Sequence, residues 1–188
     1  MSYSRHNQPT KYDQEASTNI DMDLKISRTS KYEKNQLEVK QYLYDIITPT
    51  YPDLFTKKFS IDNVNGLSTI DLMEMLKDGE VLCKLGSLIP IPNNPTSKFK
   101  NSRMAFIQME NISFFLKLCE LVGVSHDEIF QTVDLYESKD PYQVIITLMS
   151  LSRIVNSIDS NVFKYVIGPK PPKVKPNVPT KPLSLKTQ

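Results

Sequence analysis

The side chains that could do chemistry are few in this sequence. The two histidines are His6, in a polar stretch, and His126, in the first turn of a predicted helix. A histidine at a helix start is far more often an exposed residue than a base or a metal ligand. The sequence has no phosphate-binding glycine loop, no nucleophile elbow, no zinc motif and no calcium-binding loop.

Four acids close in sequence and two cysteines are the remaining candidates for chemistry. A solvated cluster at helix starts explains the acids better than a pair of catalytic carboxylates. Both cysteines lie in apolar helical patterns, where reduced core thiols are the usual finding. We therefore predict a protein that is not an enzyme, with no catalytic, cofactor-binding or metal site. The candidates are Asp71, Glu74, Asp78, Glu80, Cys83 and Cys119.

The chemistry that the sequence does support is electrostatic binding by its C-terminal end. Residues 164–188 carry six lysines and no acid, a charge of +6, and the chain as a whole is +2. The other 163 residues therefore sum to −4. Such a tail favours an acidic partner surface. It lacks arginine and interleaved aromatic residues, so it does not predict nucleic-acid binding. The candidate binding lysines are Lys170, Lys173, Lys175, Lys181 and Lys186.

Two smaller basic clusters and one proline motif are weaker candidates. Lys57-Lys58 and the group Lys98, Lys100 and Arg103 lie in predicted loops, where charge is usually only solvated. In the tail, Pro176, Pro179 and Lys181 fit the PxxPxK arrangement that SH3 domains bind, although such patterns are common by chance in proline-rich tails.

The element around which the chain is organised is a predicted helix over residues 103–124. Its apolar residues recur at helical spacing and extend to Phe106, Phe115 and Leu118, so we expect a central helix closed by Gly123. Polar residues interrupt it too often for a membrane span. The expected core comprises Tyr42, Leu82, Leu85, Met109, Ile112, Leu116, Cys119, Phe130 and Leu148.

Other helices are predicted around this one, and no segment alternates convincingly as a strand. The first covers residues 31–48 and stops at Pro49; two short helices meet at Asp78-Gly79; Ser125 and Asp140 begin two more. Residues 48–68 read as a long loop. We therefore predict an all-α domain over 31–158, a disordered arm over 1–30, and a basic, proline-rich, extended tail over 159–188.

Three stretches resemble calponin-homology domains, most closely those of the calponin/transgelin family and its fungal branch. They are Leu76-Lys-Asp-Gly-Glu-Val-Leu-Cys-Lys-Leu85, Phe106-Ile-Gln-Met-Glu-Asn-Ile-Ser-Phe-Phe-Leu116, and Glu128-Ile-Phe-Gln-Thr-Val-Asp-Leu135 leading into Lys139-Asp-Pro141. The resemblance covers about residues 31–158. It implies a single domain with four main helices and short connectors.

The resemblance implies that the chain binds and cross-links actin filaments in the cytoplasm, in cortical actin structures. An adaptor whose tail binds SH3 domains is the alternative from another class, and a microtubule-binding module is a third. The chain departs from the family in having Tyr42 where a tryptophan is usual and in lacking the glycine-containing repeat that often follows the domain. The second departure puts more weight on the lysine tail.

Overall fold

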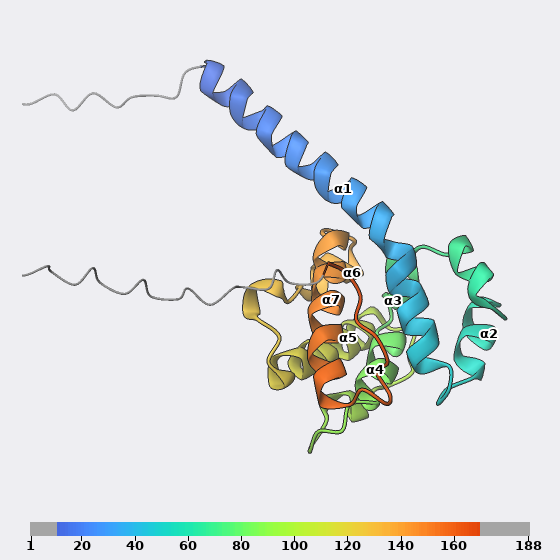
Figure 1. The fold of residues 1–188 in the computed structure, drawn as a ribbon. Coiled ribbons are helices and arrows are strands. Elements are labelled where there is room, and N and C mark those ends of the chain that lie inside the picture. The colour runs from blue at the N-terminus through green and yellow to red at the C-terminus, as the bar shows by residue number, and fades with distance from the viewer. Residues whose placement is uncertain (1–10, 170–188) are drawn as a thin grey trace, which may run out of the picture.

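The computed structural model describes residues 11–169, with side chains from residue 19 onward (Figure 1). Every regular element in this part of the chain is helical, so the all-α prediction is confirmed. The elements are α1 (Lys11–Ile47), α2 (Asp53–Phe59), η1 (Val64–Thr69), α3 (Leu72–Leu76), α4 (Glu80–Ser87), η2 (Pro95–Lys98), α5 (Ala105–Val122), η3 (His126–Glu128), α6 (Thr132–Tyr136) and α7 (Pro141–Ile158), where η marks a 3-10 helix.

The core lies between the four longer helices of the bundle. The C-terminal part of α1 packs against α7, and α4 packs against α5. Most of the residues expected in this core are buried, namely Tyr42, Leu82, Leu85, Ile112, Cys119, Phe130 and Leu148. Met109 and Leu116 are only half-buried, and Phe115 and Leu118 take the fully buried positions on α5 instead. The buried face of α5 is therefore rotated slightly from the one that the spacing predicted.

Helix α1 begins twenty residues before the start predicted at residue 31. The segment before Tyr32 has no single apolar side, which is why the pattern gave no helical signal. Arg28 is tied to the body through Asp140 and Gln143, and the Tyr32 hydroxyl donates to Asp71. Extending a helix from an anchored turn costs far less than starting one, so α1 can continue through polar residues.

The segment read as a loop, residues 48–68, contains the short helix α2 and most of η1. Phe55, Ile61 and Leu67 are each buried and attach the segment to the core. Their burial stabilises helical turns that are too short to show a periodic pattern.

Ser125 also begins less helix than predicted, because its side chain makes no cap hydrogen bond and the 3-10 turn η3 that follows ends at Glu128. The chain then extends along α7, where Thr147 accepts a hydrogen bond from the Phe130 backbone N–H at 2.9 Å and donates one to the Glu128 carbonyl at 2.6 Å. These contacts satisfy backbone groups that a longer helix would otherwise pair. At the start of α7, the Asp140 cap and Pro141 stand as predicted.

Beyond residue 158 the chain does not leave the body at once. Residues 159–169, which we call the strap, turn back between α7 and α1 (Figure 1). Phe163 and Ile167 are fully buried in the main core, and Asn156 donates a 2.6 Å hydrogen bond to the Phe163 carbonyl. The packed body therefore extends to about residue 169, past the boundary expected at 158.

Candidate functional site

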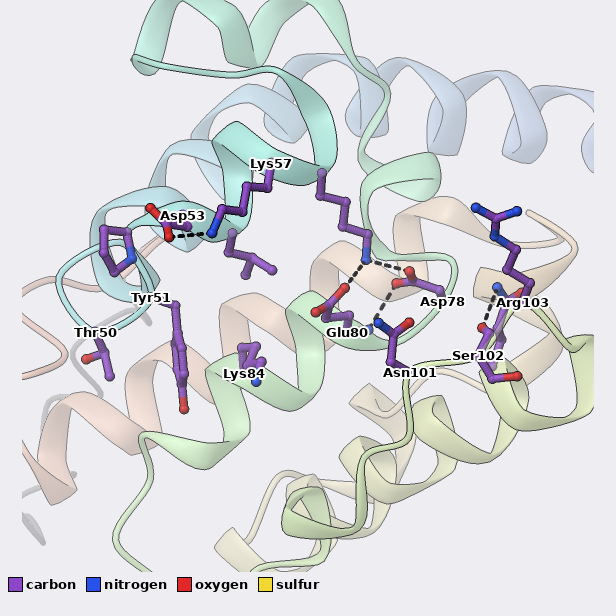
Figure 2. A pocket seen from close by; sticks show the side chains of 14 residues that line it. Thr50, Tyr51, Asp53, Lys57, Asp78, Glu80, Lys84, Asn101, Ser102 and Arg103 are labelled. Carbon is purple, nitrogen blue, oxygen red and sulfur yellow. Dashed lines mark hydrogen bonds and ion pairs between the residues drawn. The ribbon is translucent and has the colours of Figure 1, made fainter.

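An open groove of about 620 Å³ lies between α2, the start of α4 and the loop before α5 (Figure 2). Its lining includes Lys57 and Lys58 of the first basic cluster and, from the second cluster far away in the sequence, Arg103. Lys84 of α4 adds a further cation. The other lining residues are Thr50, Tyr51, Pro52, Asp53, Leu54, Asp78, Glu80, Asn101, Ser102 and Gln108. Lys98 and Lys100 do not line the groove.

Carboxylates neutralise one side of this groove. The Lys58 ammonium lies 2.5 Å from an Asp78 oxygen and 2.7 Å from a Glu80 oxygen, and all three side chains are largely buried. Lys57 pairs with Asp53 at 2.7 Å, but both are exposed and the pair contributes little. Lys58 therefore acts as a structural cation that joins α2 to the turn before α4.

The cations that remain available are Lys84 and Arg103. The Lys84 nitrogen lies 4.7 Å from the centre of the Tyr51 ring and 5.6 Å from that of Phe99, which positions its charge by cation–π contacts. Arg103 is exposed and takes part in none of the ion pairs found in the described part of the chain. Figure 2 shows Tyr51 and Lys84 on one side of the groove and Arg103 on the other.

The walls of the groove are joined by a turn that depends on Gly79 and Asn111. Gly79 has φ +76°, and a Cβ atom there would lie 2.7 Å from the Cβ of Asn111. The buried Asn111 amide donates to the carbonyls of Asp78 (3.2 Å) and Lys100 (2.9 Å), and its oxygen accepts from the Lys100 backbone N–H at 3.1 Å. One side chain therefore links the start of α4, the loop after η2 and α5.

Two large apolar side chains stand in solvent directly after Arg103. Met104 is 67% exposed and Phe106 is 70% exposed, so Phe106 is not part of the buried stripe to which the helical spacing assigned it. An arginine, a methionine and an aromatic ring are residue types enriched at protein interfaces. Met104 and Phe106 do not line the groove, but with Arg103 they form an exposed surface next to it that has the composition of a protein-binding surface, a feature for which the sequence gave no signal.

The predicted tail lysines, Lys170 to Lys186, lie outside the described residues, as do the SH3-type residues Pro176 and Pro179. What the structure does fix is where the tail begins. The Tyr165 hydroxyl donates to Asp45 at 2.8 Å, its ring meets Tyr42 edge-on, and the Gly168 N–H donates to Glu38 at 3.2 Å. These contacts hold the strap on α1.

The tail starts at a basic part of the body. Pro169, the last described residue, borders a hollow together with Lys31, Lys34 and Arg153.

The histidine, cysteines and acids considered as catalytic candidates are either exposed, buried in the core or paired with neighbouring residues. His126 is exposed in η3. Cys83 and Cys119 are buried free thiols, and burial raises the pKa of Cys83 to about 12, so it stays protonated at neutral pH. Asp71 accepts hydrogen bonds from Tyr32 and from the Met73 backbone, whereas Asp78 and Glu80 pair with Lys58. Within residues 11–169, the helices lack a sufficiently long apolar run to span a bilayer.

These helices, in this order, form an all-α bundle, and the comparison with known families agrees with this fold class. The family model of the calponin homology (CH) domain matches residues 58–157, so the chain belongs to the calponin homology family. Among curated proteins, transgelin of Saccharomyces cerevisiae is 37% identical over 175 residues, covering 90% of this chain and 80% of the relative. Myophilin of Echinococcus granulosus is 43% identical over 97 residues, covering 52% of this chain and 50% of the relative.

Proposed function

We propose that this chain binds actin filaments and cross-links them, as a non-enzymatic protein of the cytoplasmic, cortical actin cytoskeleton. The domain is one contact region and the lysine tail is the other. Membership in the calponin/transgelin family supports the choice of actin as partner. The observation that supports two separate contact regions is the charge distribution, which is +6 over residues 164–188 and −4 over the rest of the chain.

The physical basis of the tail contact is charge neutralisation. An actin filament presents a strongly acidic surface, and a series of lysines can neutralise such a surface with little geometric demand. The prolines between the lysines favour extended backbone, so less conformational entropy is lost on binding. A body with net charge −4 is repelled by the filament on average and needs a local basic contact.

That local contact, in our proposal, is the edge of the groove. Lys84 and Arg103 supply charge that no carboxylate among the described residues pairs with, and the exposed Met104 and Phe106 supply apolar contact area beside it. Replacing Lys84 and Arg103 together with glutamine should weaken filament binding. Lys117→Gln, on an exposed position of α5, is the matched control and should leave binding unchanged.

The decisive experiment is co-sedimentation with actin filaments at high speed for binding and at low speed for bundling. Three proteins are compared: the full chain, residues 1–169, and a full-length variant with Lys170, Lys173, Lys175, Lys181 and Lys186 replaced by glutamine. The truncation keeps the strap, and the glutamine variant keeps the prolines and the length, so charge is the tested variable. Added salt should weaken binding by the full chain steeply, because exposed charges are screened beyond about 8 Å at physiological ionic strength.

Each outcome assigns a role. If the glutamine variant binds but does not bundle, the tail is the second contact and the domain is the first. If it binds and bundles like the parent, the tail is only a spacer and the two-region proposal is wrong. If the parent pellets with microtubules instead of actin, the choice of partner is wrong as well.

A further inference from the structure

The hollow at the root of the tail lies between α1 and α7, which pack on each other there (Figure 1). It has a volume of about 370 Å³. The charged side chains that line it are all cations, Lys31 and Lys34 from α1 and Arg153 from α7, and none of its described lining residues is acidic. Like charges gathered around one hollow repel one another unless a negative group lies between them. The hollow is therefore a candidate anion site.

Arg153 is the cation whose polar groups are least satisfied. Its Nε atom is buried and has no hydrogen-bond partner among the described residues. Its only ion pair in this part of the chain is with Glu128 at 4.0 Å, and the other Glu128 oxygen accepts a hydrogen bond from Ser150. At 4.0 Å two charged groups attract each other but form no hydrogen bond. The guanidinium therefore still has donors to offer to an oxyanion in the hollow.

The two lysines on the α1 side are also available. Lys31 and Lys34 are exposed, and neither takes part in an ion pair within the described residues. The Lys31 nitrogen lies 5.8 Å from the centre of the Tyr142 ring, and this cation–π contact keeps its charge at the wall of the hollow. Residues three apart on a helix are neighbours on its surface, so both ammonium groups can approach one ligand.

The number and kind of donors favour a phosphate group over a carboxylate. A carboxylate brings a single negative charge to these three cations, whereas a phosphate ester carries a charge of about −1.5 to −2 at neutral pH and has three acceptor oxygens. Its oxygens match the planar fork of an arginine, and lysines add charge with little demand on geometry. Because the donors come from two helices, a tetrahedral group can accept hydrogen bonds from both sides.

The rest of the lining is mostly apolar and indicates what is attached to the phosphate. This part is formed by Tyr142, Ile146, Met149 and Pro169. Such a wall favours the organic part of a ligand over water. The volume of the hollow lies at the lower end of the range for small-molecule sites, which is about 300–1,000 Å³. It therefore suits a phosphate joined to a ring or a short chain.

We propose that this hollow binds a phosphate ester with an aromatic or apolar organic part. The phosphate lies between Lys31, Lys34 and Arg153, and the organic part lies on Tyr142 and Ile146. The bound ligand connects α1 to α7 beside the strap, so it stabilises the folded chain. The site does not include the groove, and the inference does not depend on the actin proposal.

The melting temperature of the full-length chain in the presence of phenyl phosphate, at constant ionic strength, tests the site. The tail itself attracts anions, so every protein in this test carries glutamine at the same five tail positions, Lys170, Lys173, Lys175, Lys181 and Lys186. Phenyl phosphate should raise the melting temperature of this parent. A parent that it does not stabilise overturns the proposal.

A matched pair of double variants tests the position of the site. Lys31→Gln/Lys34→Gln should raise the dissociation constant of phenyl phosphate by about tenfold or more, because it removes two charged hydrogen-bond donors. Lys98→Gln/Lys117→Gln removes the same charge from exposed positions outside the hollow and should bind like the parent. If the first double variant binds unchanged, or if both weaken binding equally, the proposal is wrong.

Arg153→Lys tests the role of the arginine fork, since it keeps the charge and removes the planar pair of donors. It should raise the dissociation constant severalfold. Because this constant is measured against the unliganded state of the same variant, a loss of packing alone does not change it. An Arg153→Lys protein that binds like the parent overturns the place of Arg153 in the site.

Further probes test the class of ligand. Inorganic phosphate lacks the organic part and benzoate lacks the second charge, so both should bind more weakly than phenyl phosphate. Equal binding of benzoate overturns the choice of phosphate, and tighter binding of a hexaglutamate peptide would assign the hollow to an acidic protein segment instead. Vesicles of neutral lipid with and without phosphatidic acid separate the sources of the phosphate. Vesicle binding that Lys31→Gln/Lys34→Gln abolishes assigns it to a lipid headgroup, and phenyl phosphate binding without vesicle binding assigns it to a soluble ligand.

Discussion

At the scale of single residues, Gly79 and Asn111 position the groove. Gly79 has a backbone conformation that side chains disfavour, and it lies against Asn111, whose amide holds the loop at Lys100. The same two residues therefore couple α4 to α5 and fix how far Lys84 stands from Arg103. A change at either residue should alter both stability and the shape of the groove.

We predict that Gly79→Ala costs clearly more stability than Gly123→Ala. Both glycines have positive φ, +76° and +92°, so both variants carry the backbone penalty of about 1–2 kcal/mol. Only at Gly79 does the new methyl group also meet Asn111, whereas nothing lies within 4 Å at Gly123. Urea unfolding of the two variants measures the difference, and equal losses would show that the Asn111 contact relaxes freely.

Along α5, neighbouring leucines should respond differently to truncation. Leu118 is fully buried, Leu116 is half-buried and Leu121 is exposed. Leu118→Ala should cost about 2–5 kcal/mol, Leu116→Ala less, and Leu121→Ala within about 0.5 kcal/mol. The order is what matters: a Leu116→Ala variant that loses as much as Leu118→Ala would mean that the buried face is the one that the sequence predicted. Chemical denaturation of the three variants gives the order.

At the scale of elements, the strap belongs to the domain although the sequence places it in the tail. It has no regular structure, yet it contributes Phe163 and Ile167 to the core and joins α7 to α1 through Tyr165 and Asp45. An element of this kind lowers the freedom of the two helices and sets the exit point of the basic tail. The strap therefore connects the stability of the domain to the position of its second proposed contact region.

We predict that ending the chain at residue 158 is strongly destabilising and that ending it at residue 169 is not. The shorter chain exposes the core sites that Phe163 and Ile167 fill, and loss of one such side chain alone costs about 3–5 kcal/mol. Melting temperatures of the two truncations and the full chain, measured in one buffer, test this. A truncation at 158 that melts with the full chain would show that the strap does not contribute to stability.

For the molecule as a whole, the packed body begins near the residue that the sequence predicts and extends further than predicted at its C-terminal end. Residues 19–30 meet the body through Arg28, which donates to Asp140 and Gln143. The Arg28 and Asp140 side chains are 40% and 35% exposed, so we expect their pair to contribute no more than about 1 kcal/mol. Tyr32 is already within the core. From these contacts we expect residues 31–169 to fold independently.

We predict that residues 31–169 unfold cooperatively, with a free energy of unfolding within about 1 kcal/mol of the full chain. Circular dichroism should show a loss of helix signal equal to the removed segment and no more. Truncation to residues 31–169 removes charged residues together with length. The two proteins are therefore compared at moderate salt, which screens the difference in charge. A much less stable 31–169 protein would show that residues 19–30 contact the body through more than the Arg28 ion pair.

The helical class, the main helices and several of their start and stop residues could be predicted from the sequence alone. Asp140 with Pro141 begins α7, Gly123 ends α5, and Asp78-Gly79 separates α3 from α4. These features depend on backbone chemistry within a few residues, so they can be read locally. The specific order of three motifs also sufficed for the family, which the comparisons confirm.

Which distant residues come into contact could not be predicted from local patterns. Lys58 and Arg103 lie 45 positions apart and share one groove because Asn111 draws the Lys100 loop onto the start of α4. Phe163 and Ile167 pack in the core without a periodic pattern, since an irregular strap places side chains by contact and not by helical spacing. Residues 19–30 are helical because they extend an anchored turn. Their apolar residues alternate along the sequence and so form no single helical face. Such outcomes depend on contacts between distant segments, which no local pattern records.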